Sequence, residues 1–141
     1  MSGHDWDMQP ELILDARADL GEGPAWESRT GRLYWVDIHA RNLHIFNPQD
    51  ATDLRIEVGE FIGCAAPRRA NGLVLGLRSG FAILDSPLLA KQPRRGQGEA
   101  GVRTIVNPEP HLPGNRFNDG KCDPAGRFLA GHLAAAAPSA G

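Results

Sequence analysis

The segments SRTGRLYWVD (28–37), RRANGLVLGL (68–77) and DPAGRFLAGH (123–132) repeat one pattern along the chain. Each begins with polar residues, turns at a glycine and continues into an apolar run that is long enough for a β-strand. The three glycines are 41 and 54 residues apart, and the first two segments are each followed by a further apolar run and a proline-containing turn. About four short strands in roughly 40–50 residues are typical of one blade of a β-propeller. A β-sandwich also uses strands at such intervals, but the repeat favours the propeller.

The rest of the chain consists of similar short apolar runs, each bounded by Gly, Pro, Asn or Asp. These residues punctuate tight turns, and few windows hold a helical period for ten residues. A helix is the alternative only for residues 86–92 and for the alanine-rich tail. The sequence therefore predicts an all-β fold. The expected strands are residues 32–38, 43–47, 54–58, 61–66, 72–77, 81–85, 102–106 and 126–131.

Composition and charge are those of an ordinary globular domain, with 41% hydrophobic and 23% charged residues in 141. The formal net charge of −2 gives no reason to expect a nucleic-acid or membrane partner. No run reaches 18 apolar residues, and the polar N-terminus lacks the basic start and apolar stretch of a signal peptide. Cys64 and Cys122 form no disulfide framework and no CxxC motif, so we expect a reducing, cytoplasmic location.

Two longer motifs carry a resemblance. LGEGPAWESRTGRLYWVDI (20–38) and NRFNDGKCDPAGRFLAGHL (115–133) resemble the family of gluconolactonase, regucalcin and luciferin-regenerating enzyme, which has a GEGPxW segment in its first blade and an RFNDGKxDPxGRxxxGTM segment in its third. The resemblance implies a six-bladed β-propeller about twice as long as this chain, a central divalent metal (calcium, zinc or manganese) and hydrolysis of a sugar lactone. We therefore expect a truncated arc of about two and a half blades over residues 12–133, between a polar segment (1–11) and an alanine-rich tail (134–141).

The resemblance also implies three site residues. Glu22 matches the family's metal-ligating glutamate, and hard cations take carboxylate oxygens; from its residue type alone, an exposed loop glutamate is the more ordinary role. Arg116 and Asn118 match positions that contact substrate, and on a strand they would share one face while Phe117 takes the other. The alternatives are a surface ion pair for Arg116 and a hairpin turn at residues 118–120.

Two further predictions concern the scaffold. DPAGR (123–127) is expected to form a turn, because its proline presets φ and its glycine supplies a left-handed residue. Trp26, Tyr34 and Trp35 are expected in the core rather than in a ligand platform.

Two functions remain open at this point. The first is a metal-dependent lactonase, represented by an N-terminal part that we expect to be inactive alone, since the family takes its remaining metal ligands and its general base from later blades. The alternative is a non-catalytic calcium- or ligand-binding propeller module, or a degenerate remnant. The expected partner is a small-molecule sugar lactone, and an open arc would expose unpaired strand edges through which copies could associate.

Overall fold

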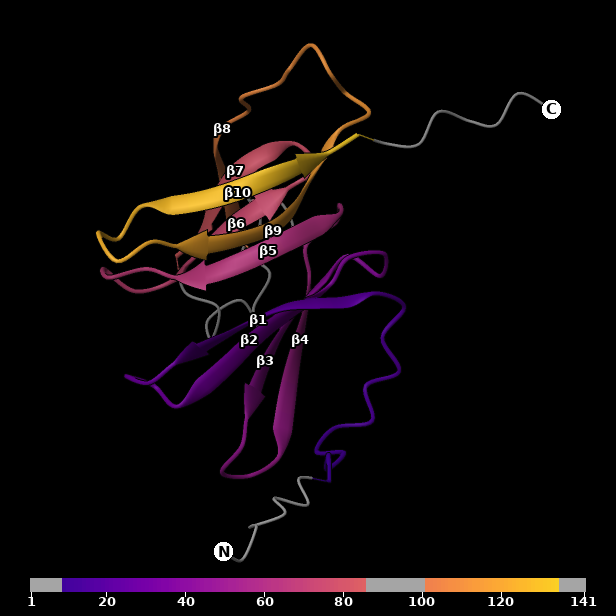
Figure 1. Ribbon diagram of the computed structural model, residues 1–141, viewed down its shortest axis with the longest axis vertical. Coiled ribbons are helices and arrows are strands. Elements are labelled where there is room, and N and C mark those ends of the chain that lie inside the picture. The colour runs from indigo at the N-terminus through magenta and orange to yellow at the C-terminus, as the bar shows by residue number, and fades with distance from the viewer. Residues whose placement is uncertain (1–8, 86–100, 135–141) are drawn as a thin grey trace, which may run out of the picture.

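The structure is a computed structural model that describes residues 9–85 and 101–134 (Figure 1). In these ranges the chain forms antiparallel β-strands, and nothing there is a helix long and apolar enough to cross a membrane. The strands pair in sequence order, in two four-stranded sheets and a third sheet of two strands. The first sheet contains β1 (Gly21–Glu27), β2 (Arg32–Asp37), β3 (Asn42–Asn47) and β4 (Thr52–Glu57). The second contains β5 (Ile62–Pro67), β6 (Leu73–Leu77), β7 (Gly80–Leu84) and β8 (Val102–Val106), and the third contains β9 (Arg116–Cys122) and β10 (Phe128–Leu133).

The glycines of the repeated sequence pattern share one backbone conformation. Gly31, Gly72 and Gly126 have φ values of 62°, 73° and 83°. Glycine adopts this left-handed region without the steric cost that a Cβ would bring. Each glycine ends a turn shortly before β2, β6 or β10 begins. The repeat is therefore a repeat of structure, with one such turn in each sheet.

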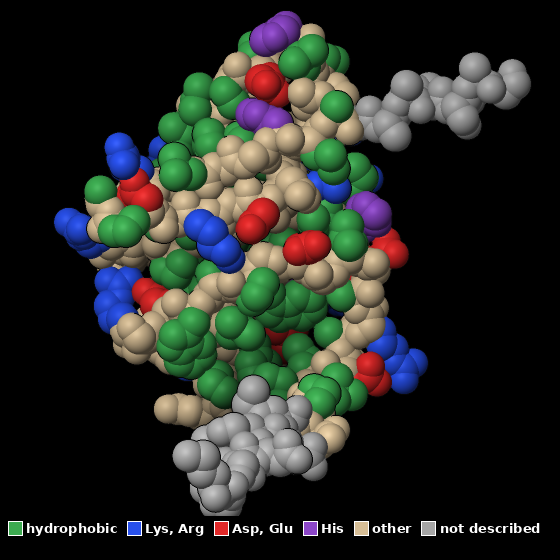
Figure 2. Space-filling model, in the orientation of Figure 1, with side chains coloured by type: hydrophobic (Ala, Val, Ile, Leu, Met, Phe, Trp, Pro, Cys, Tyr) green, Lys and Arg blue, Asp and Glu red, His purple; other side chains and the backbone are tan. Residues whose placement is uncertain are grey.

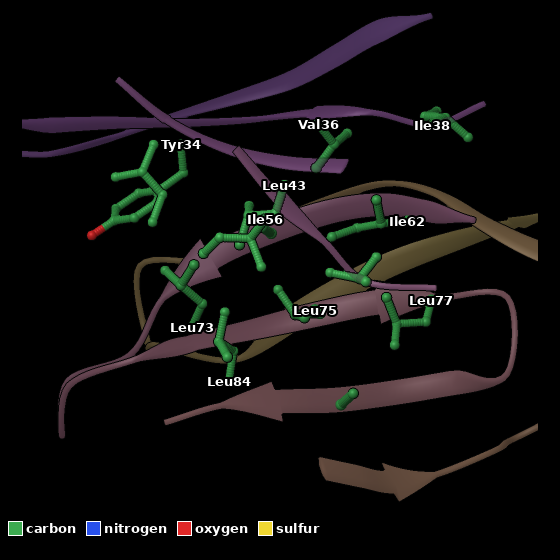
Figure 3. Close-up of a cluster of buried hydrophobic side chains, with 14 residues drawn as sticks. Tyr34, Val36, Ile38, Leu43, Ile56, Ile62, Leu73, Leu75, Leu77 and Leu84 are labelled. Carbon is green, nitrogen blue, oxygen red and sulfur yellow. The ribbon is translucent and has the colours of Figure 1, made fainter. Parts of the chain in front are cut away.

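The first two sheets pack face to face around one hydrophobic core (Figure 3). In β2 and β3, Tyr34 lies opposite Ile45 and Val36 opposite Leu43, so that one face of the sheet is apolar. Burying a large aliphatic side chain completely contributes about 1.5–3 kcal/mol, and this core holds the two sheets together. Its buried members are Tyr34, Val36, Ile38, Leu43, Ile45, Ile56, Val58, Ile62, Ala65, Leu73, Leu75, Leu77, Ala82 and Leu84.

The third sheet packs on the second through aromatic rings. Phe117 of β9 is 1% exposed, and its ring centroid lies 4.4 Å from that of Phe81 in β7. The ring of Phe128 in β10 lies 5.9 Å from the ring of Phe81. Figure 1 shows β9 beside β5, the first strand of the second sheet. This approach requires small residues, since a Cβ on Gly120 would lie 2.7 Å from the Sγ of Cys64.

The predicted all-β organisation is confirmed, as are two four-stranded sheets and the start of a third between residues 20 and 133. Each of the eight runs predicted as strands overlaps a strand, and the bounds differ by at most two residues. The segment 21–27 was not among the expected strands, and it forms β1. The helix considered for residues 86–92 lies outside the described residues, as does the tail from residue 135. The boundaries drawn at residues 11 and 133 stay predictions.

One local prediction is corrected, and one alternative is excluded. Residues 118–120 lie within β9 (Arg116–Cys122) and do not form the hairpin turn considered as the alternative; the register with β10 shifts here, between the Phe117–His132 and Gly120–Ala130 pairs. Trp26 is 56% exposed and not in the core, because it alternates with the half-buried Ala25 and Glu27 and so lies on the more exposed face of β1. Tyr34 is buried as predicted, and Trp35 is half-buried against the ring of His44.

The turn predicted at residues 123–127 is confirmed. The N–H of Asp123 donates to the carbonyl of Arg127 at 2.8 Å, and the N–H of Gly126 donates to the carbonyl of Asp123 at 2.9 Å. The Asp123 carboxylate also accepts the N–H of Arg127 at 2.8 Å. An aspartate that closes its own turn in this way is common where two strands meet.

Candidate metal and substrate site

The first strands of the three sheets, β1, β5 and β9, converge at Gly63. A Cβ built on Gly63 would lie 2.2 Å from the carbonyl oxygen of Phe117 and 2.5 Å from that of Asn118. On the other side, a Cβ on Gly23 would lie 3.7 Å from the Gly63 oxygen. The backbone that follows Glu22 and the backbone of Asn118 therefore approach the same glycine from two sheets.

Glu22 is the second residue of β1, beside an irregularity in the strand. The register with β2 shifts between Glu22 and Ala25, and Gly23 has a φ of 60°. Such bulges re-aim side chains and often lie next to functional sites. The Glu22 side chain is exposed, and no hydrogen bond or ion pair to it is present in the described part of the chain. Its carboxylate is thus available to a ligand, as an ordinary surface glutamate would be.

Asp37 holds the chain that leads into Glu22. Its carboxylate accepts the N–H of Asp19 at 2.9 Å, of Leu20 at 3.0 Å and of Ala40 at 3.2 Å. Burial alone would raise the pKa of Asp37, but these three backbone donors together lower it below its usual value. Sequence analysis gave Asp37 no role; the available signal was an acidic residue that ends an apolar strand and precedes a turn.

Arg116 and Asn118 lie on the opposite side of β9 from Phe117, as predicted. The Arg116 Nη1 donates to the Phe117 carbonyl at 3.1 Å and to the Asn118 Oδ1 at 3.2 Å. Phe117 is held from the other side by Phe81 and by the ring of His132, whose centroid is 4.1 Å away. The Arg116 contacts are to its own strand, so the surface ion pair considered for it is not present among the described residues. Its other guanidinium nitrogens and the Asn118 amide nitrogen remain as donors.

Two open hollows flank these residues without including them. One, of about 400 Å³, lies between residues 107–115 and the Arg78–Ser79 turn. The other, of about 470 Å³, follows the far ends of β1, β5 and β9. Neither of these two hollows is lined by any of the three predicted site residues. Glu22 and Asn118 are exposed, and Arg116 is half-buried.

The donors present fit a hard divalent cation in kind but not in number. Glu22 offers carboxylate oxygens and Asn118 an amide oxygen, which are the ligands that calcium prefers. Calcium takes six to eight oxygens. Over residues 9–85 and 101–134, no group of three or more His, Cys, Asp or Glu side chains is placed to hold a metal.

The thiol nearest to this region is unsuited to nucleophilic catalysis. Cys64 follows Gly63 on β5 and is 1% exposed. Burial raises the pKa of its thiol to about 12, so almost none of it is the reactive thiolate at neutral pH. Its role is packing, because the Sγ fills the space left by Gly76 and Gly120.

The chain is similar in sequence and in structure to proteins of one family. Residues 20–141 match the model of the SMP-30/Gluconolactonase/LRE-like region. A 6-deoxy-6-sulfogluconolactonase of Pseudomonas putida is 40% identical over 81% of this chain and 35% of its own length. A luciferin-regenerating enzyme structure superposes with a TM-score of 0.72 and 30% identity, over 86% of this chain and 38% of that one. A calcium-binding protein, regucalcin from Agrobacterium tumefaciens, gives a TM-score of 0.68 and 25% identity, over 83% and 36%.

The chain thus spans well under half the length of these relatives. Its two four-stranded sheets and its two-stranded third sheet correspond to an arc of their six-bladed propeller. The resemblance carried by residues 20–38 and 115–133 is confirmed, and the chain belongs to the SMP-30/gluconolactonase/LRE-like family.

Proposed function

We propose that this chain contributes to metal-dependent hydrolysis of a sugar lactone, with Glu22 as a metal ligand and Arg116 and Asn118 as substrate contacts. The observation that carries the proposal is the convergence of β1, β5 and β9 at Gly63, where the strands of Glu22 and Asn118 meet. The name of the Pseudomonas putida relative, a sulfogluconolactonase, supports a lactone as the substrate.

The residues of this chain have distinct tasks in that reaction. Glu22 would hold calcium, zinc or manganese, and a divalent ion bound there would lower the pKa of water and polarise a carbonyl. Arg116 presents a planar fork of donors suited to lactone and hydroxyl oxygens. Because its Nη1 is held by the Phe117 carbonyl and the Asn118 side chain, the fork is fixed before substrate arrives. Preorganised donors of this kind need little rearrangement on binding.

A second candidate is a non-catalytic module that binds calcium or a small ligand. It is favoured by the calcium-binding regucalcin among the structural neighbours. The two candidates differ in one respect: a binding module holds the ion without turning over a lactone.

The test measures metal binding and lactone turnover separately. Calcium, zinc and manganese are titrated calorimetrically into the chain, and hydrolysis of D-glucono-1,5-lactone is followed for the chain alone and for the chain extended with the remaining sheets of a lactonase relative. We expect Glu22→Gln to weaken metal binding, and excess metal to restore part of the activity of the extended chain. Arg116→Lys should lower kcat/KM by about 10–100-fold, the loss of a charge-assisted hydrogen bond, and excess metal should not restore it.

Matched controls lie on β4, away from Gly63. Glu57→Gln and Arg55→Lys make the same chemical changes at exposed positions and should leave binding and turnover unchanged. Asn118→Ala should lower kcat/KM, with rescue by metal only if Asn118 also contacts the ion or its water. Metal affinity that is unchanged in Glu22→Gln would remove the ligand role proposed for it.

The remaining inferences concern location and partners. Cys64 and Cys122 are both free thiols, which supports the reducing, cytoplasmic location that we infer. On the face in Figure 2, basic side chains gather along the left edge with acidic ones among them. We infer a small molecule as the partner, rather than nucleic acid or a membrane, from the net charge of −2.

A further inference from the structure

The hollow of about 400 Å³ is formed by the second and third sheets, apart from the candidate site. One wall is the connection between β8 and β9 (Figure 1), and the other contains Glu60 and the Arg78–Ser79 turn. His132 of β10 also lines it. Its volume lies within the range of small-molecule sites, roughly 300–1,000 Å³. Because it includes none of the three candidate site residues, it is a separate place at which this chain can hold a ligand.

The connection between β8 and β9 is held in one shape by hydrogen bonds. The N–H of Leu112 donates to the carbonyl of Glu109, and the N–H of Asn115 donates to the carbonyl of Leu112, both at 3.0 Å. The Arg78 guanidinium ties the connection to the second sheet, since its Nη2 donates to the Pro113 carbonyl at 3.0 Å. Prolines at positions 108, 110 and 113 restrict φ further. A wall that is preformed in this way loses little conformational entropy when a ligand binds.

The two carboxylates of the hollow already have partners. The Glu60 carboxylate accepts the N–H of Ser79 at 2.8 Å and the Ser79 hydroxyl at 2.6 Å. The Glu109 Oε2 accepts the Asn115 amide nitrogen at 2.8 Å and lies 3.5 Å from the Nδ1 of His132. An anion in the hollow would lie beside both carboxylates, and a cation would lie beside the guanidinium of the facing turn. Like charges in contact are unfavourable, so the hollow favours a neutral ligand.

The hollow also offers hydrogen-bonding atoms that nothing in the described part of the chain uses. Asn107 accepts the N–H of Glu109 at 3.0 Å through Oδ1, which leaves its amide nitrogen as a donor. Asn115 donates through its amide nitrogen, which leaves its Oδ1 as an acceptor. Leu112, which is 42% exposed, adds apolar surface to the same wall. A hydroxyl group both donates and accepts, so a molecule with several hydroxyl groups and apolar C–H faces matches this lining.

We propose that this hollow binds a neutral polyhydroxylated molecule, a monosaccharide or a polyol. Glu109 is the central acceptor: its Oε2 joins Asn115 to His132, and within the described residues its Oε1 accepts no hydrogen bond. The inference goes beyond the proposed function and does not depend on it, since it involves neither a metal nor any of the candidate site residues.

The probe is methyl β-D-glucopyranoside, a neutral sugar without a lactone or ester bond. Its binding to the 141-residue chain is followed by saturation-transfer difference NMR, which detects weak binding and works for a monomer and for a self-associated chain alike. We expect saturable transfer to the glucoside. Its affinity should be at least about 10-fold higher than that of D-gluconate, because an anion would lie beside two carboxylates.

The decisive variant is Glu109→Gln, which keeps the shape of the side chain and an oxygen that can accept from Asn115 but removes the charge. It should weaken glucoside binding by about 5–10-fold, because hydrogen bonds to charged groups are roughly twice as strong as neutral ones. Leu112→Ser removes apolar surface at an exposed position and should also weaken binding, without altering Glu109. Glu57→Gln, at an exposed position of β4, is the matched control and should leave the affinity unchanged.

The outcomes separate this inference from the proposed function. Glucoside binding that is weakened by Glu109→Gln or Leu112→Ser, with the β4 control unchanged, supports the hollow even if the chain neither binds a metal nor hydrolyses a lactone. Transfer that is lost in Arg116→Lys but kept in Glu109→Gln would place the sugar at the candidate site and overturn the inference. The absence of saturable transfer, or an affinity that is the same in the wild type and in both hollow variants, would overturn it as well. Gluconate that binds as tightly as the glucoside would overturn the choice of a neutral ligand.

Discussion

Replacing Gly63 by alanine should separate the second and third sheets. The added Cβ would lie 2.2 Å from the Phe117 carbonyl oxygen and 2.5 Å from that of Asn118, while real Cβ contacts essentially never fall below 3.0 Å. Strands β5 and β9 would therefore have to move apart by about 0.8 Å. Both obstacles are backbone atoms, which cannot rotate away as a side chain can. Overpacking of this kind costs about 1–3 kcal/mol, and we expect the upper end of that range.

The assay is urea unfolding followed by far-ultraviolet circular dichroism and tryptophan fluorescence. Gly131→Ala in β10 is the matched control, since a Cβ there meets nothing within 4 Å; it should change the free energy of unfolding by less than about 0.5 kcal/mol, as surface substitutions usually do. Gly63→Ala should also disturb Asn118 and so weaken any metal binding. Equal free energies of unfolding for Gly63→Ala and Gly131→Ala would refute the close approach of β5 and β9.

Three further predictions concern stability, reactivity and association. Because the pKa of the Asp37 carboxyl is lowered in the folded state, its stabilising effect should be complete above about pH 4, the ordinary pKa of an unfolded aspartate, and be lost as pH falls through the folded value. Asp37→Asn should therefore reduce the loss of stability at acid pH in urea titrations. An unchanged acid dependence would contradict the role given to the three backbone hydrogen bonds of Asp37. Iodoacetamide at pH 8 should alkylate the exposed Cys122 and spare the buried Cys64, as mass spectrometry of digests would report, and equal labelling would show that β5 is not packed. Leu129 and Leu133 of β10 are 60% and 46% exposed on the last strand described. Their replacement by lysine should therefore reduce self-association in analytical ultracentrifugation. A wild-type chain that is a monodisperse monomer would contradict association through this sheet.

The sheets were predictable because their signals are local. Apolar runs that end at Gly, Pro, Asn or Asp determine β2 to β8 almost residue by residue. Strand β1 was not predictable in this way, since GEGPAWE has two glycines, a proline and little alternation; it is a strand because the edge of β2 supplies its hydrogen-bonding partners. Trp26 was misjudged because residue type does not reveal which face of a strand is buried.

The candidate site was likewise predictable only in part. Glu22, Arg116 and Asn118 were found through the family motif, and the strand alternation around Phe117 was predictable from period two. The convergence at Gly63 was not, because it depends on how three separate sheets stack. Asp37 was missed because its partners, the N–H groups of Asp19 and Leu20, lie 18 and 17 residues away, and no sequence period links residues at that distance.

The sequential pairing of strands has a consequence for synthesis of the protein. The first sheet is complete within residues 21–57, with every strand joined to its neighbour in the sequence. Short loops between such neighbours carry a small closure entropy, and mainly local contacts favour rapid folding. At translation rates of about 5–20 residues per second, this sheet can form on the ribosome before the strands that follow it emerge. Each later sheet then meets a formed apolar face, and the hydrophobic surface exposed during synthesis stays limited to one sheet at a time.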